Sequence, residues 1–134
     1  MKYWLVKTEP DVYSWDTFTK DKKTFWDGVR NYEARNNMRD MAKGDEVIFY
    51  HTGKEKQAVG IATVVKTAYQ DPTTDDDRWV CVDLKPKKPL SKPVTLADVK
   101  ATPSMAEMGL VKKGRISVIP VTKKEFDTIV KMGG

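Results

Sequence analysis

The order of apolar and polar positions predicts a strand and then a helix at the start of the chain. The apolar run from Tyr3 to Thr8 predicts a strand, which Pro10 ends because proline cannot donate to a strand ladder. Ser14 is a suitable N-cap for a short helix that places Trp15 and Phe18 on one face.

A second helix is predicted from Asn31 to about Met41. Ala34, Met38 and Met41 follow helical spacing, Asn31 is a suitable N-cap, and Gly44 suits the C-terminal end.

Three strands are then predicted in succession, and we expect them to be antiparallel. The segments Glu46–Thr52, Gln57–Tyr69 and Arg78–Leu84 are rich in Val, Ile and aromatic residues. Turn signals separate them at Gly53 and at Asp71-Pro72.

The last third of the chain begins with a polar, proline-rich stretch. Lys85–Pro93 holds three prolines and four lysines, which predicts an exposed basic connection rather than a central strand. One capped helical turn is expected over Thr95–Ala101, and a strand over Ile116–Val121. Thr122 and Glu125 fit a capping box that opens a C-terminal helix.

Strands outnumber helices in this order and mostly follow one another directly. The pattern therefore predicts an α+β domain with a curled or closed sheet, in preference to a parallel sheet. The 134 residues contain no internal repeat and no long linker, so residues 1–134 are expected to form a single domain.

The charge of the chain favours a polyanionic partner. The formal net charge is +5, and the basic excess is concentrated between Lys85 and Arg115. There is no apolar run long enough for a signal-peptide core or a membrane span, so we expect a soluble cytoplasmic protein.

Several kinds of chemistry lack their usual residues. Cys81 is the only cysteine and His51 the only histidine, which excludes a disulfide framework and makes a zinc site or a Cys/His nucleophile pair a poor expectation. We expect Cys81 to be buried and inert and His51 to be hydrogen-bonded near a strand end. No glycine-rich phosphate loop is present, and no cofactor or metal is implied.

Aromatic residues crowd the first quarter of the chain beside hydrogen-bonding side chains. Flat rings and polar groups together are what a base-binding pocket requires, because a base offers two faces for stacking and a polar edge. Burial statistics assign most of these rings, such as Trp4 and Phe18, to the core. Trp26 lies in a loop-like stretch before the second predicted helix, which predicts an exposed indole available to a ligand.

Five blocks of sequence resemble the EVE domain, as found in bacterial single-domain EVE proteins and in the thymocyte nuclear protein group. They are YWLVKTEP at Tyr3–Pro10, WDGVRNYEARNNMR at Trp26–Arg39, GD at Gly44-Asp45, FYH at Phe49–His51 and VGIA at Val59–Ala62. The resemblance implies the PUA-like fold of the YTH, ASCH and PUA domains, a small mixed or antiparallel β-barrel flanked by short α-helices. It also implies a non-catalytic module that reads a modified base, such as methylated or hydroxymethylated cytosine in DNA or a modified base in RNA.

The resemblance, the aromatic cluster and the basic stretch after Leu84 together select the candidate site residues. The base-pocket candidates are Trp26, Lys7, Thr8, Ser14, Asn31, Tyr32 and Asn36. The candidates for phosphate binding are Arg30, Arg35, Arg39, Lys85, Lys87 and Lys88. Nucleic acid is the expected partner, and the sequence leaves open DNA or RNA, the modification and the oligomeric state.

Two other functions remain open at this point. The same pocket would suit a small planar molecule, such as a free nucleobase or nucleoside, with binding that is insensitive to salt. An enzyme that hydrolyses a modified base or an amide with Lys7 or Glu9 is a third hypothesis, although no activated nucleophile or acid/base pair is visible.

Overall fold

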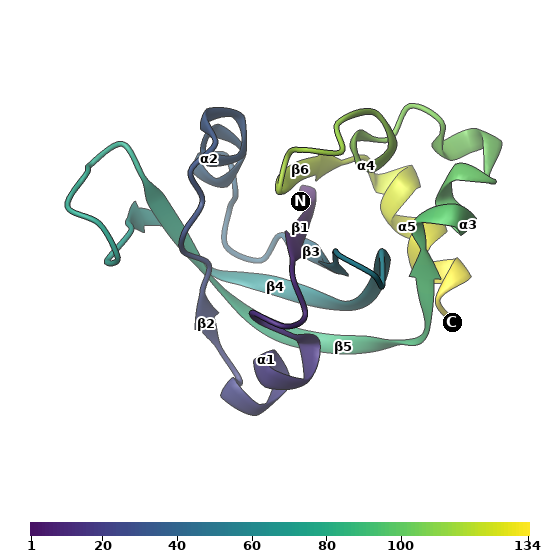
Figure 1. Ribbon diagram of the computed structural model, residues 1–134, viewed down its shortest axis with the longest axis horizontal. Helices are drawn as coiled ribbons and strands as arrows, with labels where there is room; N and C mark the ends of the chain where they lie inside the picture. Colours follow the sequence, from purple (N-terminus) through teal and green to yellow (C-terminus); the bar gives the residue numbers. More distant parts are fainter.

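The structure is a computed structural model that describes residues 1–134 (Figure 1). Its strands are β1 (Tyr3–Thr8), β2 (Thr24–Phe25), β3 (Glu46–His51), β4 (Gln57–Gln70), β5 (Val80–Thr95) and β6 (Val118–Val121). Its helices are α1 (Trp15–Asp21), α2 (Tyr32–Arg39), α3 (Leu96–Lys100), α4 (Gly109–Lys112) and α5 (Lys123–Met132), with a 3-10 turn at Pro103–Met105. The α+β class predicted from the sequence is confirmed.

All the strands belong to one mixed sheet in the order β2-β5-β4-β3-β1-β6. The antiparallel succession of β3, β4 and β5 is confirmed, whereas β1 runs parallel to β3. The expected closed barrel is wrong, because the edge strands β2 and β6 do not pair with each other. β2 has only two residues and already pairs with β5, so the strand that would have to close a barrel is too short to do so.

β5 corrects a second expectation from the sequence. The stretch Lys85–Pro93 is not a connection, because β5 continues through it to Thr95 and pairs with β4. β2 pairs with β5 at Asp83 and Leu84, so β5 is an edge strand beyond Leu84. Prolines are tolerated at an edge, where no neighbouring strand needs their missing N–H, and exposed lysines discourage further pairing. The predicted exposure of Lys85 is confirmed.

The helix starts predicted from the sequence are confirmed. Each of the four predicted N-cap side chains accepts a hydrogen bond from the backbone three residues later, and these residues are Ser14, Asn31, Thr95 and Thr122. Thr95 and Thr122 form complete capping boxes with Asp98 and Glu125. No helix has both the length and the apolar character needed to cross a membrane.

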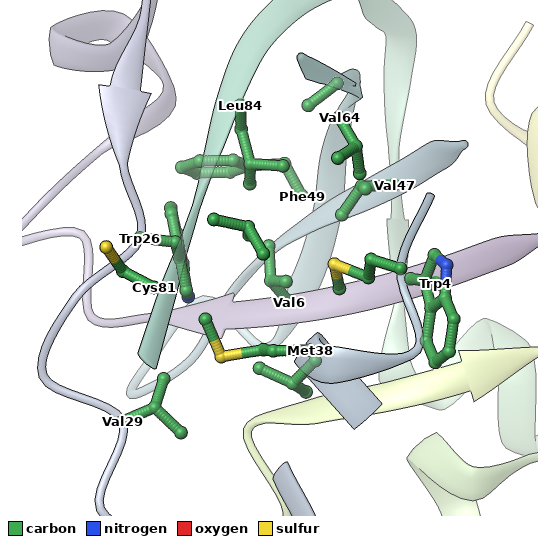
Figure 2. Packing of buried hydrophobic residues seen from close by; sticks show 14 of the residues in the cluster. Trp4, Val6, Trp26, Val29, Met38, Val47, Phe49, Val64, Cys81 and Leu84 are labelled. Atoms are coloured by element: carbon green, nitrogen blue, oxygen red, sulfur yellow. The ribbon is translucent and has the colours of Figure 1, made fainter. Parts of the chain in front are cut away.

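The sheet separates two apolar clusters. Trp4 and Val6 of β1 belong to one cluster, shown in Figure 2, and Leu5 belongs to the other, as alternation along a strand requires. In the first cluster the rings of Phe18 and Phe49 stack at 5.1 Å between centroids. This cluster supports the back of the pocket described below.

Candidate functional site

A pocket of about 440 Å³ opens where the C-terminal end of β1 meets the segment from Thr24 to Arg30. Its walls combine aromatic, apolar, charged and hydroxyl-bearing residues: Lys7, Thr8, Val12, Tyr13, Thr24, Phe25, Trp26, Asp27, Gly28, Val29, Arg30 and Ser117. The volume is in the range of small-ligand sites and can hold one planar ring system.

Two aromatic rings meet in the pocket at nearly a right angle. The centroids of Tyr13 and Trp26 are 6.2 Å apart, and the ring planes differ by 78°. A flat ligand that stacks on one ring therefore meets the other edge-on, and both arrangements are favourable between aromatic groups. Behind the pocket, the edge-to-face contact of Trp26 with Phe49 at 5.5 Å holds the indole in place.

Trp26 is mostly buried, which corrects the expectation of an exposed indole. Only 8% of the residue is exposed, and its ring belongs to the first apolar cluster. The reason is that the Trp26 backbone N–H donates to the carbonyl of Val82 at 2.7 Å, which extends the pairing of β2 with β5 and turns the side chain inward. Trp26 is therefore part of the core and part of the pocket wall.

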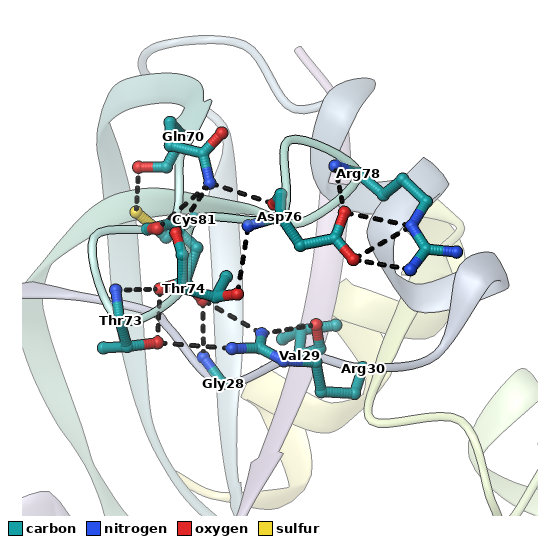
Figure 3. Close-up of polar contacts among 10 residues, drawn as sticks. Gly28, Val29, Arg30, Gln70, Thr73, Thr74, Asp76, Arg78 and Cys81 are labelled. Atoms are coloured by element: carbon teal, nitrogen blue, oxygen red, sulfur yellow. Dashed lines mark hydrogen bonds and ion pairs between the residues drawn. The ribbon is translucent and has the colours of Figure 1, made fainter.

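Asp71 fixes the conformation of the segment that follows Trp26. The sequence analysis missed this role. Its side chain is fully buried and accepts hydrogen bonds from the Gly28 backbone at 2.9 Å and from Arg30 Nη1 at 3.1 Å. The Thr73 backbone donates to its other oxygen at 2.7 Å. Figure 3 shows Gly28, Arg30 and Thr73 converging in this network. The only signal in the sequence is Asp71-Pro-Thr, a turn in which aspartate accepts from the backbone two residues later.

The network also determines the charge of Asp71. Burial opposes ionisation, but the hydrogen bonds from Thr73, Gly28 and Arg30 outweigh it and lower the pKa of the carboxyl to about 2. Gly28 has a φ of 74°, a left-handed conformation that glycine adopts without strain. A stable carboxylate and a glycine turn therefore present Asp27 and Val29 to the pocket.

The pocket offers donors and acceptors to a ligand. Lys7 Nζ donates to the carbonyl of Gly114 at 3.0 Å, which leaves two N–H groups of the ammonium for other partners. Burial lowers the pKa of Lys7. A ligand that places an anion or a carbonyl oxygen beside the ammonium would oppose this effect and favour the charged form. The carboxylate of Asp27 is exposed, and in its ionised form it accepts hydrogen bonds and donates none.

Four of the residues selected from the sequence line this pocket: Lys7, Thr8, Trp26 and Arg30. The Thr8 hydroxyl donates to the carbonyl of Tyr13 at 3.0 Å, so it positions the aromatic wall. Tyr13 and Asp27 also line the pocket and were not selected as contacts, although Tyr13 was counted in the aromatic cluster and Asp27 in the resemblance.

Ser14 and Asn31 do not line the pocket, because both are helix caps. Ser14 Oγ accepts from the Thr17 backbone at 3.1 Å, and Asn31 Oδ1 accepts from the Ala34 backbone at 2.9 Å. A single local pattern, a polar side chain before a helix, accounts for both residues.

Tyr32, Asn36 and Arg35 lie on α2, outside the pocket. Tyr32 is 51% exposed, and its ring lies 5.2 Å from that of Trp79. The guanidinium of Arg35 lies 4.9 Å from the Tyr32 ring, and the same guanidinium donates to Asn36. These residues form an exposed aromatic and cationic surface beside the pocket.

The remaining phosphate candidates are exposed and separate from the pocket. Arg39 ends α2, and Lys85, Lys87 and Lys88 project from β5. Lys87 forms an ion pair with Glu46.

His51 and Cys81 occupy the positions expected for structural residues. His51 Nε2 accepts a hydrogen bond from the Trp15 backbone at 3.0 Å, and its Nδ1 lies 2.8 Å from Glu55 Oε1, which confirms the predicted hydrogen-bonded histidine. Cys81 is buried, and burial raises its thiol pKa. No group of three or more His, Cys, Asp or Glu side chains is arranged to hold a metal ion.

The fold and the pocket together define a class, an α+β domain with a six-stranded mixed sheet and an aromatic pocket at one end of that sheet. The fold is similar to that of a mutant ASCH protein from Zymomonas mobilis, with a TM-score of 0.61 and 11% identity over the full length of both chains.

Within this class, the chain belongs to the EVE-domain family, whose match spans residues 2–132. It is 48% identical to Rpa0253 of Rhodopseudomonas palustris, with a TM-score of 0.95 over 100% of this chain and 94% of that one. It is 34% identical to thymocyte nuclear protein 1 of Mus musculus, over 97% of this chain and 73% of the relative. Human THYN1, crystallised in complex with DNA that contains 5-methylcytosine, is 29% identical, with a TM-score of 0.88 over 99% of this chain and 98% of that one. The resemblance inferred from the sequence is confirmed.

Proposed function

We propose that this chain binds nucleic acid without catalysis and holds one modified base in the corner formed by the Tyr13 and Trp26 rings. The observation that carries the proposal is the right-angled aromatic pocket, which has the shape of a site for one planar ring. The complex of human THYN1 with DNA containing 5-methylcytosine supports it at the level of the family.

Cytosine and its derivatives fit the polar groups of the pocket. A carboxylate accepts a hydrogen bond from the exocyclic amino group of cytosine, and Asp27 is the carboxylate in the lining. Lys7 has free N–H groups for the carbonyl oxygen of the base. Stacking on the aromatic wall adds roughly 1–3 kcal/mol.

A methyl group on the base would find apolar partners in the pocket. Val29 and Phe25 both line it, and Val29 is buried against the core. Burying one methyl contributes about 0.8 kcal/mol, which corresponds to roughly fourfold in affinity. The preference for a methylated base over its unmodified form should be modest.

A base must leave its stack to enter the pocket. Extrusion from a duplex costs a few kcal/mol, about as much as one stacking contact returns. We therefore expect single-stranded or mismatched sites to bind more tightly than a perfect duplex.

A binding role agrees with the contacts of the titratable pocket residues. Lys7 donates to a backbone carbonyl, Arg30 to Asp71, and the Tyr13 hydroxyl to Asp21 at 2.9 Å. Each of these groups already has a partner within the protein and supports the pocket wall.

The test is a titration with short single- and double-stranded DNA and RNA that carry cytosine or 5-methylcytosine, at several salt concentrations. The wild type is compared with Tyr13→Ala and Asp27→Asn. Tyr32→Ala is the matched control, because it removes an exposed tyrosine outside the pocket. Trp26 is replaced by Phe rather than Ala, since the buried indole also supports the core.

We expect Tyr13→Ala to weaken binding about tenfold or more, in line with the loss of one stacking contact. Asp27→Asn should weaken binding to amino-bearing bases, and Tyr32→Ala should bind as the wild type does. If Tyr32→Ala alone abolishes binding, the binding site is the surface of α2 instead of the pocket.

The second candidate is a site for a free planar molecule, favoured by the pocket volume of about 440 Å³. Binding of a free nucleoside that does not depend on salt, with no binding of any oligonucleotide, would establish this candidate and exclude the first.

A further inference from the structure

Lys7 also lines a second, smaller cavity of about 170 Å³. The walls of this cavity include Tyr50, Thr52 and Lys56, and Leu96 and Leu110 contribute apolar side chains to the lining. Its volume is well below that of the neighbouring pocket and below the range for drug-sized ligands, so it suits a small polyatomic group.

The pairing of β1 with β3 brings Lys7 and Tyr50 together. The two strands are parallel, and Lys7 is in register with Tyr50, so both side chains emerge on the same face of the sheet. The register between β3 and β4 shifts between Phe49 and Tyr50, leaving Val59 as the extra residue of a bulge. Bulges re-aim the neighbouring side chains and are frequent beside functional sites.

The Tyr50 hydroxyl is a donor without a partner in the protein, on a residue that is otherwise buried. Tyr50 is only 3% exposed, and its hydroxyl forms no hydrogen bond within the protein. Since every fully enclosed polar side-chain atom is paired, the hydroxyl keeps some contact with solvent, and Tyr50 is part of the cavity lining. Burial raises the pKa of this phenol, so it remains protonated and able to donate at neutral pH.

The charged residues in the lining are both cationic. Lys7 and Lys56 supply two ammonium groups, and no acidic residue lines the cavity. The Thr52 hydroxyl donates to Glu9 Oε1 at 3.1 Å, so it is already engaged. Two ammonium groups and a phenol hydroxyl form a set of donors suited to an oxyanion.

We propose that this cavity binds a phosphate group, with Lys7 and Lys56 neutralising its charge and the Tyr50 hydroxyl donating to one of its oxygens. The proposal stands independently of base binding. Because Lys7 borders both cavities, the phosphate can come from a nucleotide whose base occupies the larger pocket, or from free phosphate in solution.

The first experiment is an NMR titration of the full chain with inorganic phosphate, compared with chloride at equal ionic strength. The backbone amides of Gly53, Lys56 and Gly114 border the cavity and should shift with phosphate only. Tyr50→Phe keeps the buried ring and removes one donor to a charged group, so phosphate binding should weaken about tenfold.

Lys54 provides the matched control for Lys56. Lys56→Gln should also weaken phosphate binding, whereas Lys54→Gln, on the same turn but outside the lining, should not. Equal shifts with chloride, or unchanged affinity in both Tyr50→Phe and Lys56→Gln, would overturn the proposal. Because Lys56 is exposed, its variant keeps the test valid even if Tyr50→Phe folds poorly.

The second experiment separates the two sources of phosphate. If the phosphate belongs to a nucleotide, cytidine 5′-monophosphate binds more tightly than cytidine or phosphate alone, and Tyr50→Phe removes the advantage. If the source is free phosphate, the monophosphate shows no advantage. A failure of oligonucleotide binding would overturn the proposed function and leave the result with inorganic phosphate standing.

Discussion

Single residues far apart in the chain determine the shape of the pocket. Asp71 follows β4, yet it holds Gly28 and Arg30 through hydrogen bonds across 43 and 41 residues. Because its carboxylate is buried and ionised, its effect on stability depends on pH.

We predict that Asp71→Asn destabilises the protein at neutral pH and has little effect in strong acid. The pKa of Asp71 in the folded protein is about 2, below its ordinary value of 3.8, so the carboxylate stabilises the fold fully above pH 3.8. That stability is lost as the pH falls through about 2. It amounts to roughly 2 kcal/mol, measurable by urea denaturation at neutral and at acidic pH.

The control for this prediction is Asp75→Asn, which changes an exposed carboxylate in the same turn. Its stability should follow that of the wild type at every pH. A difference between Asp71→Asn and the wild type that stays constant from neutral to acidic pH would contradict the assigned role of the carboxylate.

At the scale of elements, α1 and β4 pack closely because Gly60 has no side chain. A Cβ at Gly60 would lie 2.5 Å from the ring of Trp15, closer than packed atoms approach. This contact supports α1, which follows directly after the part of the pocket wall that contains Tyr13.

We predict that Gly60→Ala destabilises the protein by about 1–3 kcal/mol, the usual cost of overpacking a core. Thermal unfolding measures the effect. Gly109→Ala is the control, because a Cβ there meets Ile119 at an ordinary contact distance of 3.4 Å or more. Equal stability of both variants would show that α1 shifts to admit the added methyl group at no cost in the free energy of unfolding.

The capping box of α5 should stabilise this short helix measurably. Thr122→Ala removes the acceptor of the Glu125 backbone N–H, so we expect a loss of about 1 kcal/mol in the free energy of unfolding. Thr128→Ala makes the same chemical change inside the helix, where the hydroxyl donates to the carbonyl of Lys124, and should cost less. Chemical denaturation measures the free energy of unfolding of both variants. Equal losses in Thr122→Ala and Thr128→Ala would contradict the capping argument.

At the scale of the whole molecule, the basic residues are spread along β5. Figure 1 shows β2 and the C-terminal end of β5 on opposite sides of the molecule. Lys85 follows Leu84, which is in register with Thr24 of the pocket wall. Lys92 lies beside Gly133, whose carbonyl accepts from its backbone N–H. Seven residue steps separate the two lysines, which is roughly 23 Å along the course of the strand.

We predict that these two lysines contribute differently to nucleic-acid binding. If the nucleic acid is centred on the pocket, Lys85→Gln should reduce the slope of log affinity against log salt by about 0.7–0.9, the effect of one phosphate contact. Lys92→Gln should leave the slope unchanged. Equal effects of both variants, measured by salt-varied titration, would mean that the nucleic acid follows β5 instead.

Part of the secondary structure can be predicted from the sequence, because it depends on local physical chemistry. The caps at Ser14 and Thr122, the strand at Tyr3–Thr8 and the antiparallel succession of β3 to β5 depend on neighbouring residues, so propensity and periodicity predict them. The EVE-domain resemblance placed Lys7 and Trp26 at the candidate site, since each of them lies within one of its contiguous blocks.

Tertiary structure decided the rest, because it depends on contacts between distant residues. Whether the sheet closes depends on its edge strands, and whether the proline-rich stretch of β5 forms a strand depends on β4 beside it. Three features arise only where separate segments are brought together. They are the burial of Trp26, the hydrogen bond from the Gly28 backbone to Asp71, and the register of Lys7 with Tyr50. A pattern along the chain records which residues prefer to be buried or paired, whereas the partner of each is determined by the packing of the whole sheet.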